Sequence, residues 1–194
     1  MHTDVEGVNG SLGSAMAVGE FERVYFDDRI GGREELGLRG TEGRTGMRSI
    51  LNESDRAAIC SRVRALSASS SARWGRMSVT GMLQHLRLSA RMTVGELEVA
   101  SANKRAFQVF PLKHLIIYVL PFPKGAPTAP ELKPSVAASL EEERAAVLEL
   151  LARIGTGPRE GTGPAHPLFG PLTWREWGVA TYKHANHHLR QFGA

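Results

Sequence analysis

The fold is decided at the end of the chain, by residues 172–194, which read LTWREWGVATYKHANHHLRQFGA. Thr173 and Glu176 have the spacing of a capping box, in which each side chain accepts the backbone N–H of the other residue. Leu172 and Trp177 flank the box as a hydrophobic staple, which places Trp177 on the core side. The pattern predicts a helix that begins after Thr173. We expect it to end at Gln191 or Phe192, before Gly193.

This helix carries three histidines, and two of them share a face. His184 and His188 are four residues apart, so their side chains lie about 6 Å apart along the helix axis. The stripe that contains them also contains Trp177 and therefore points inward. His187 lies off this stripe by about 60° or more. The spacing of His184 and His188 suits two imidazoles that converge on one metal ion.

Upstream, the chain predicts three more long helices and no strand. The first is capped by Asn52 or Ser54 and runs to about Leu66, and the second begins after Ser78. The third is expected from a cap at Ser135 to about Ile154. Pro111 suits the first turn of a short helix, whereas the four prolines within residues 121–130 favour an extended connection. These elements predict an all-α four-helix bundle.

Composition sets the remaining bounds. The 194 residues carry a net charge of +4 and one cysteine, Cys60, which excludes a disulfide framework or a cysteine-built zinc site. Residues 1–46 hold 5 basic and 9 acidic residues and 10 of the 21 glycines, so we expect a disordered extension or sequence upstream of a start at Met47. The domain is then residues 47–194. Its basic residues are scattered singly, which argues against nucleic-acid binding.

No segment predicts membrane insertion or secretion. The longest apolar stretch, Leu115–Phe122, is far shorter than the roughly 20 residues that span a bilayer. No basic segment followed by an apolar run marks the N-terminus. We therefore expect a cytoplasmic protein.

A third histidine strengthens the metal hypothesis. His85 lies between Met82 and Leu86 on the apolar face of the second helix. Three inward histidines from two helices supply three nitrogens and leave coordination positions open, as in catalytic metal sites. The alternative is that the histidines only satisfy one another in the core. For the other candidates we expect a turn residue at His166, with a place at the mouth of a pocket as the alternative, and a partly buried polar side chain at His114. We expect His187 to form hydrogen bonds at the surface or between subunits, and Cys60 to be a buried small apolar residue.

Several pieces of residues 47–194 together resemble one known group of proteins. The pieces are WGRMS (74–78) leading into MLQHL (82–86), LPFPKGAP (120–127), HPLFGPLT (166–173), and EWG (176–178) followed by His184 and HLRQFG (188–193). In this order they resemble the DinB-like superfamily of metal-binding four-helix bundles, and within it a branch labelled only as a domain of unknown function. The resemblance implies that His85, His184 and His188 bind a divalent transition metal, with zinc or nickel expected. Arg87 and Ser89 follow His85 where an acidic residue is common in that superfamily, so no carboxylate base is implied.

The resemblance also implies possible activities. Some members of the superfamily are thiol-dependent S-transferases or isomerases, so we expect a small-molecule substrate and a low-molecular-weight thiol as partners. Hydrolysis is the weaker variant because no general base is evident. The alternative is a non-catalytic bundle that binds a metal or ligand in a structural or stress-related role. The superfamily's bundles often pair, which makes a homodimer the expected assembly, without nucleic acid or membrane.

Overall fold

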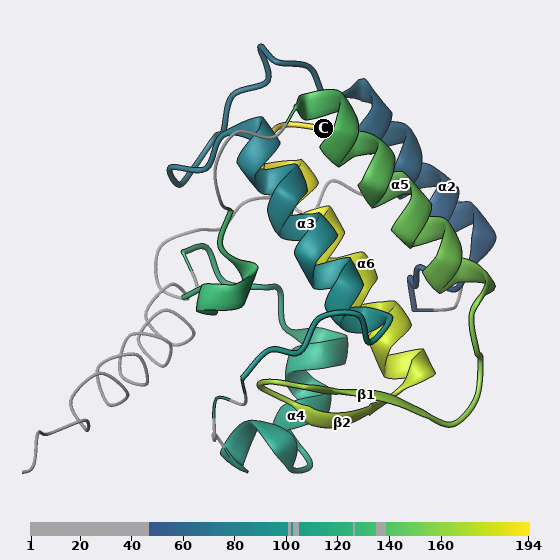
Figure 1. Cartoon of the computed structure of the whole chain (residues 1–194). Coiled ribbons are helices and arrows are strands. Elements are labelled where there is room, and N and C mark those ends of the chain that lie inside the picture. The colour runs from purple at the N-terminus through teal and green to yellow at the C-terminus, as the bar shows by residue number, and fades with distance from the viewer. Residues whose placement is uncertain (1–46, 101, 103–104, 126, 135–138) are drawn as a thin grey trace, which may run out of the picture. The chain divides into compact units, whose positions relative to one another are not determined.

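The computed structural model describes residues 47–100, 102, 105–125, 127–134 and 139–194 (Figure 1). The expectations for residues 1–46 lie outside this range. The described elements are α2 (Glu53–Ala65), α3 (Val79–Thr93), η1 (Arg105–Gln108), α4 (Leu112–His114), η2 (Leu115–Val119), η3 (Pro130–Leu132), α5 (Leu140–Thr156), β1 (Thr162–His166), β2 (Gly170–Thr173) and α6 (Trp174–Gln191). Residues 47–122 and 128–194 belong to one compact unit, which contains all of these elements, and residues 123–127 are assigned to another.

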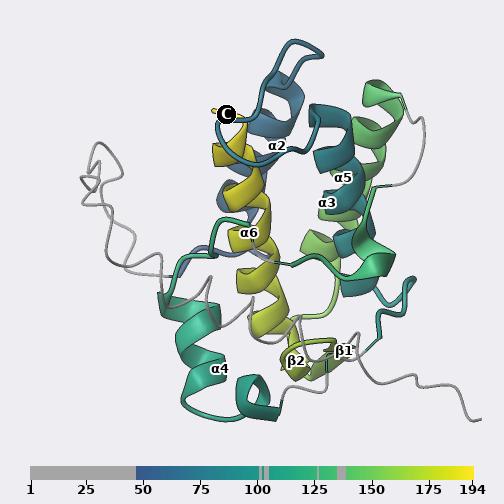
Figure 2. The same cartoon turned by 90° about the vertical axis from the view of Figure 1, so that its left-hand side faces the viewer.

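Four long helices build the main unit, as the sequence predicts. Helix α5 packs against α2 and α3, and α6 packs against α2 and α3 from the other side (Figures 1 and 2). Helices α3 and α6 run in opposite directions, because Thr93 meets Thr181 at one end and Trp74 meets Gln191 at the other. The core between the helices includes side chains that are almost fully buried: Ile59, Val63, Met82, Leu83, Val147 and Leu189.

The first two helices begin where the sequence predicts. The Asn52 side chain accepts from the backbone N–H groups of Ser54 and Asp55, and the Ser78 hydroxyl accepts from that of Gly81. The start of α5 differs from the prediction. The cap is Ser139, whose hydroxyl accepts from Glu142 N–H, and the helix begins at Leu140. The predicted cap Ser135 lies outside the described residues.

The capping box of α6 forms as predicted. The Glu176 N–H donates to the Thr173 hydroxyl at 3.2 Å, and the Thr173 N–H donates to the Glu176 carboxylate at 2.7 Å. Leu172 is 0% and Trp177 2% exposed, so both residues of the predicted staple are buried. The helix ends at Gln191, and Gly193 follows at a φ of +75°, a left-handed conformation that glycine adopts at low cost.

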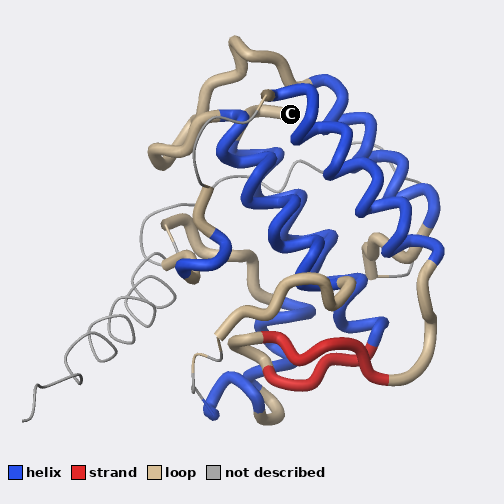
Figure 3. The backbone as a smooth tube through the Cα atoms, viewed as in Figure 1, coloured by secondary structure: helices blue, strands red, loops and turns tan. Residues whose placement is uncertain are grey.

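A two-stranded hairpin precedes α6, which corrects the prediction of a purely α-helical domain (Figure 3). Strands β1 and β2 pair antiparallel, with Thr162 opposite Thr173 and His166 opposite Gly170. The first strand contains glycine, proline and alanine rather than alternating apolar residues, so its sequence carries no strand signal. The hairpin turn is held by His166, whose Nδ1 accepts from the backbone N–H groups of Leu168 and Phe169 at 3.1 and 3.3 Å. The expectation that His166 is a turn residue is confirmed.

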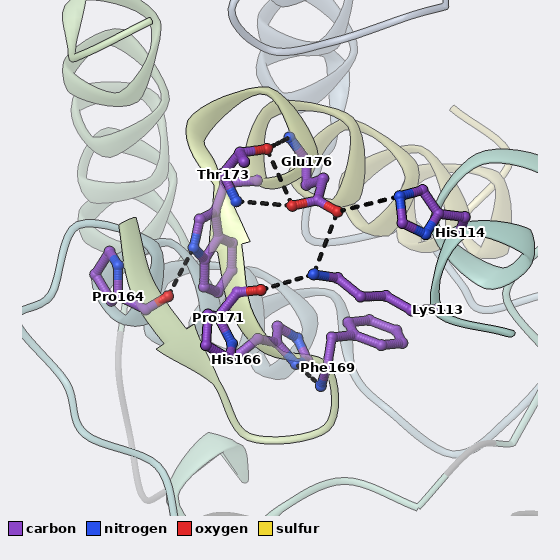
Figure 4. A network of polar contacts seen from close by, with 9 residues as sticks. Lys113, His114, Pro164, His166, Phe169, Pro171, Thr173 and Glu176 are labelled. Carbon is purple, nitrogen blue, oxygen red and sulfur yellow. Dashed lines mark hydrogen bonds and ion pairs between the residues drawn. The ribbon is translucent and has the colours of Figure 1, made fainter. Parts of the chain in front are cut away.

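Polar contacts tie the hairpin and the short helix α4 to the start of α6 (Figure 4). The Trp177 indole donates to the Pro164 carbonyl at 2.9 Å. The Lys113 ammonium donates to the Pro171 carbonyl at 2.7 Å and lies 3.3 Å from the Glu176 carboxylate. His114 lies 3.9 Å from the same carboxylate, but its side chain is 47% exposed, so the expectation of a partly buried residue is wrong. These contacts fix the position of α6 at its first turn.

Among the described helices, none combines the length and the apolar character that a membrane span requires.

We predict that Thr173→Ala lowers the free energy of unfolding by about 1 kcal/mol, the typical contribution of an N-cap side chain. The substitution removes the acceptor for the Glu176 N–H and leaves the helix dipole unchanged. Thr173→Ser keeps the hydroxyl and should unfold within a few tenths of a kcal/mol of the wild type. Urea unfolding followed by circular dichroism measures both. Equal losses in the two variants would contradict a capping role for the hydroxyl.

The hairpin turn also predicts a pH dependence. Burial lowers the pKa of His166 to about 3, whereas the unfolded value is about 6.5. The unfolded chain therefore binds the extra proton more readily, and the stability contributed by this group is lost as the pH falls from about 6.5 towards 3.

His166→Asn keeps an acceptor for the two backbone N–H groups but does not titrate. We expect the stability of this variant, in metal-free buffer, to fall less than that of the wild type between about pH 7.5 and about pH 5. Identical pH dependence in the wild type and His166→Asn would show that protonation of His166 does not limit the stability of the turn.

Candidate metal centre

Helices α3 and α6 bring the three predicted histidines together. His85 comes from the middle of α3 and is buried, while His184 and His188 come from the last two turns of α6 and are partly exposed. One ring nitrogen from each lies within 4.8 Å of those of the other two. Within the described part of the chain, this group contains three histidines and no carboxylate.

The three rings face one another through their Nε2 atoms. The Nε2 of His184 lies 2.9 Å from that of His85 and 3.1 Å from that of His188. The rings are tilted or edge-on to one another, with centroids 4.8 to 4.9 Å apart. The lone-pair positions of three imidazoles are thereby directed into one small volume.

A backbone carbonyl fixes the proton of His85. The His85 Nδ1 lies 2.8 Å from the carbonyl oxygen of Leu132, in η3. A carbonyl oxygen only accepts, so the Nδ1 of His85 carries the proton and donates it. In the neutral ring, the Nε2 of His85 is then a bare lone pair.

Gln191 fixes the proton of His188 in the same way. The Gln191 Nε2 donates to the carbonyl of Trp74 at 2.8 Å, so the other end of the amide, Oε1, faces His188. Oε1 lies 2.9 Å from the His188 Nδ1, which must therefore be the donor. Gly75 lets the chain pass close to this amide: its φ is +78°, and a Cβ there would lie 2.9 Å from the Gln191 Nε2.

At most one proton is consequently available to the three Nε2 atoms when the rings are neutral. His184 can donate to one neighbour, which leaves at least one pair of lone pairs facing each other. A second proton would require a charged ring, which the site disfavours. Burial, followed by the nearby rings of His188 and His85, holds the pKa of His184 well below its usual value. Burial also lowers the pKa of His85 and brings that of His188 to about 3.

Small polar side chains continue along α3 beyond His85. Ser89 is one turn further and 7% exposed, and its Oγ has no hydrogen-bond partner within the described part of the chain. Thr93, another turn on, donates to the Ser89 carbonyl and lies 3.4 Å from the Thr181 hydroxyl of α6. Arg87 instead pairs with Glu143 of α5 at 2.5 Å. Ser89 is therefore the polar side chain of α3 closest in sequence to His85 on this face.

Aromatic rings lie beside the histidines. The centroid of the Phe122 ring lies 6.0 Å from that of His184 and 6.4 Å from that of His187. The Trp74 ring meets His187 edge-on at 5.8 Å. His187 itself packs against His188 at 5.1 Å but is outside the group of converging nitrogens, as its helical phase predicts. An apolar wall thus stands next to the polar cluster.

Lys183 has a position that the sequence analysis did not anticipate. Its ammonium donates to three backbone carbonyls, those of Ile116, Ile117 and Leu120, at 2.7 to 2.8 Å. Burial lowers its pKa to about 8. For the contact between Gln191 and His188, the i, i+3 separation of the two residues on α6 is the signal in the sequence. The contact of His85 with the Leu132 carbonyl has no such signal, because every residue has a backbone carbonyl.

The remaining candidates lie apart from the cluster. Cys60 of α2 is partly buried against the apolar core, and burial raises the pKa of its thiol. Glu96 pairs at the surface with Arg153 at 2.6 Å. Neither joins the histidine group.

Residues 47–194 match the family described as a protein of unknown function (DUF1569). The match covers most of the chain, which therefore belongs to this family. No curated protein and no solved structure is significantly similar to the chain.

The hydrogen bonds predict an unusual protonation pattern in the metal-free protein. We expect His85 and His188 to carry their protons on Nδ1, the tautomer that is less common in free histidine. Nitrogen-15 NMR spectra that correlate ring protons with both ring nitrogens identify the tautomer. In Gln191→Leu, His188 should shift towards the Nε2–H form, whereas His85 keeps its bond to Leu132. Nε2–H signals for both rings in the wild type would contradict the assignment.

Proposed function

We propose that this member of the DUF1569 family binds one divalent transition metal, zinc or nickel, through the Nε2 atoms of His85, His184 and His188. We further propose that it uses the metal to activate a small thiol, whose sulfur forms a bond to an electrophilic carbon of a small molecule while the leaving group departs from that carbon and the thiol proton passes to solvent. The observation that carries the metal assignment is the convergence of three Nε2 atoms that share at most one proton. The lone pairs of these nitrogens repel one another when they face each other without a proton between them. A cation bound by all three Nε2 atoms would replace this repulsion by three bonds, and neither the neutral nor the protonated rings can form such bonds with one another.

The spacing of the nitrogens fits such an ion. Nitrogens bound at about 2.1 Å are about 3.0 Å apart at a right angle and about 3.4 Å apart at the tetrahedral angle. The Nε2 separations of 2.9 and 3.1 Å from His184 are close to the first value. The hydrogen bonds to Leu132 and Gln191 hold two of the rings in the tautomer that metal binding needs, an arrangement typical of the groups that orient metal-bound histidines.

The donor set favours chemistry over a purely structural role. Three imidazoles leave coordination positions for an exogenous ligand, which is the pattern of catalytic metal sites. A bound divalent metal would lower the pKa of a coordinated thiol and so supply a thiolate nucleophile at neutral pH.

The protein's own residues contribute position and surroundings. His85 and His188 are held from behind by their Nδ1 bonds, so their Nε2 atoms stay aligned without rearrangement. Ser89 is one turn beyond His85 on α3 and has no hydrogen-bond partner among the described residues, so its hydroxyl would be available to a bound small molecule. Since no described carboxylate belongs to the group, the proton released by a thiol passes to solvent rather than to a protein base.

The resemblance to the DinB-like superfamily supports this reading. It assigns the same three positions to the metal and includes thiol-dependent transferases among its members. The absence of a carboxylate from the described histidine group disfavours hydrolysis, which needs a base to act on water.

Metal content is the first test. We expect about one equivalent of a transition metal per chain in protein purified without an affinity tag, or after reconstitution with zinc or nickel. The His184→Ala/His188→Ala variant should lose it. His114→Ala, which removes an exposed histidine, should keep it. A wild type that binds neither ion would overturn the metal assignment.

The second test separates catalysis from binding. Metal-loaded wild type should accelerate the loss of free thiol in the presence of an electrophilic alkylating substrate, and the double histidine variant should not. Equal thiol loss in both proteins, with the metal retained by the wild type, would replace the transferase by the alternative of a metal-binding bundle without this chemistry.

A further inference from the structure

The segment that carries Phe122 ends in an unusual way. Residues Leu115–Val119 form a π-helical turn, in which the Leu120 N–H donates to the Leu115 carbonyl at 2.8 Å. Pro121 comes next and has no N–H, so the Ile116 carbonyl cannot receive the equivalent bond. The last carbonyls of this segment therefore need a donor from elsewhere.

Lys183 supplies that donor. Its three N–H groups reach the carbonyls of Ile116, Ile117 and Leu120 at 2.7, 2.8 and 2.7 Å. This accounts for every hydrogen of the ammonium. A side chain of α6 is thereby joined to the end of the π-helical turn, one residue before the candidate ligand His184.

The same contact places the Phe122 ring. Phe122 is two residues beyond Leu120, and its ring centre lies 5.3 Å from the Lys183 Nζ. The centre of the Phe122 ring also lies 6.0 Å from that of the His184 ring and 6.4 Å from that of the His187 ring. Because Lys183 and His184 are consecutive on α6, their side chains diverge by about 100°. The Phe122 ring is in contact range of both.

We propose that Phe122 is a specificity-determining residue of the histidine centre and that Lys183 is the positioning residue that holds it there. Phe122 covers the His184 side of the cluster with an aromatic wall. A ligand that reaches the three Nε2 atoms on this side packs against that wall, so the centre favours thiols with an apolar or aromatic substituent over small polar ones. The ligand preference rests on the proposed function, whereas the cover over His184 does not require a metal.

The cover is tested in metal-free protein with diethyl pyrocarbonate, which acylates unprotonated imidazole. Tandem mass spectrometry measures the acylation rate of His184, with exposed His114 of the same molecule as the internal standard. We expect the relative rate for His184 to rise severalfold in Phe122→Ala and in Lys183→Met. Lys183→Arg retains donors for the carbonyls and should restore slow acylation. Val119→Ala trims a 69% exposed apolar side chain of the same segment and should leave the rate unchanged.

Each result decides one part of the proposal. An unchanged His184 rate in Phe122→Ala would overturn the cover. A raised rate in Phe122→Ala with an unchanged rate in Lys183→Met would overturn the positioning role of Lys183.

The ligand preference is tested with Co²⁺-loaded protein and two thiols, benzyl mercaptan and 2-mercaptoethanol. Absorbance titration measures thiol binding to the cobalt. The wild type should bind benzyl mercaptan more tightly than 2-mercaptoethanol. Phe122→Ala should lower the ratio of the two affinities about fivefold, which is the effect of losing one aromatic contact. The same preference in both proteins would overturn the specificity role. Protein that takes up no Co²⁺ would count against the proposed metal site, and the acylation rates would still decide whether Phe122 covers His184.

Discussion

The arrangement of this domain depends on one electrostatic constraint: three imidazole Nε2 atoms converge, and at most one proton is available to them in the neutral state. The hydrogen bond to the Leu132 carbonyl keeps the proton of His85 on Nδ1, and the hydrogen bond to the Gln191 amide oxygen does the same for His188. Such a cluster is costly without a cation, since an unpaired buried polar atom loses its hydration without compensation. A protein that folds around this arrangement needs a helix pair whose register is fixed to within a fraction of a turn.

The rest of the domain supplies that register. At one end of α6, the capping box of Thr173 and Glu176 sets where the helix begins, and the hairpin and Lys113 are bonded to its first turn. At the other end, Gln191 is joined to the Trp74 carbonyl, which precedes α3. Apolar packing of α2 and α5 against α3 and α6 closes the core. Two other short segments, η3 and the stretch that follows the π-helical turn and carries Phe122, supply part of the surroundings of the histidines.

The sequence predicted those features that local patterns encode. Capping residues, apolar periodicity and the i, i+4 histidine pair placed α2, α3, α6 and the three histidines correctly. The sequence did not predict the hairpin because residues 162–166 show no alternation of apolar and polar residues and contain no β-branched side chain other than Thr162. The hairpin is held instead by the hydrogen bonds of the Trp177 indole and of the His166 ring. The cap of the third helix was predicted at Ser135, whereas the structure has it at Ser139; a serine before an apolar-periodic stretch is a plausible cap at either position, so residue type alone does not fix where the helix begins. The partners of His85 and Lys183 are backbone carbonyls. Every residue has one, so no pattern of side chains predicts these contacts.

The centre combines three converging ring nitrogens with an aromatic wall, and the ligand proposed for it is a soft anion, a thiolate with an apolar substituent. The most direct test of the account is a crystal structure of the zinc- or nickel-loaded protein, with anomalous diffraction recorded at the absorption edge of the metal. We expect a single anomalous peak between α3 and α6, bonded to the Nε2 atoms of His85, His184 and His188, with further positions filled by solvent. No peak at this place, or a metal bonded through Nδ1, would contradict the account.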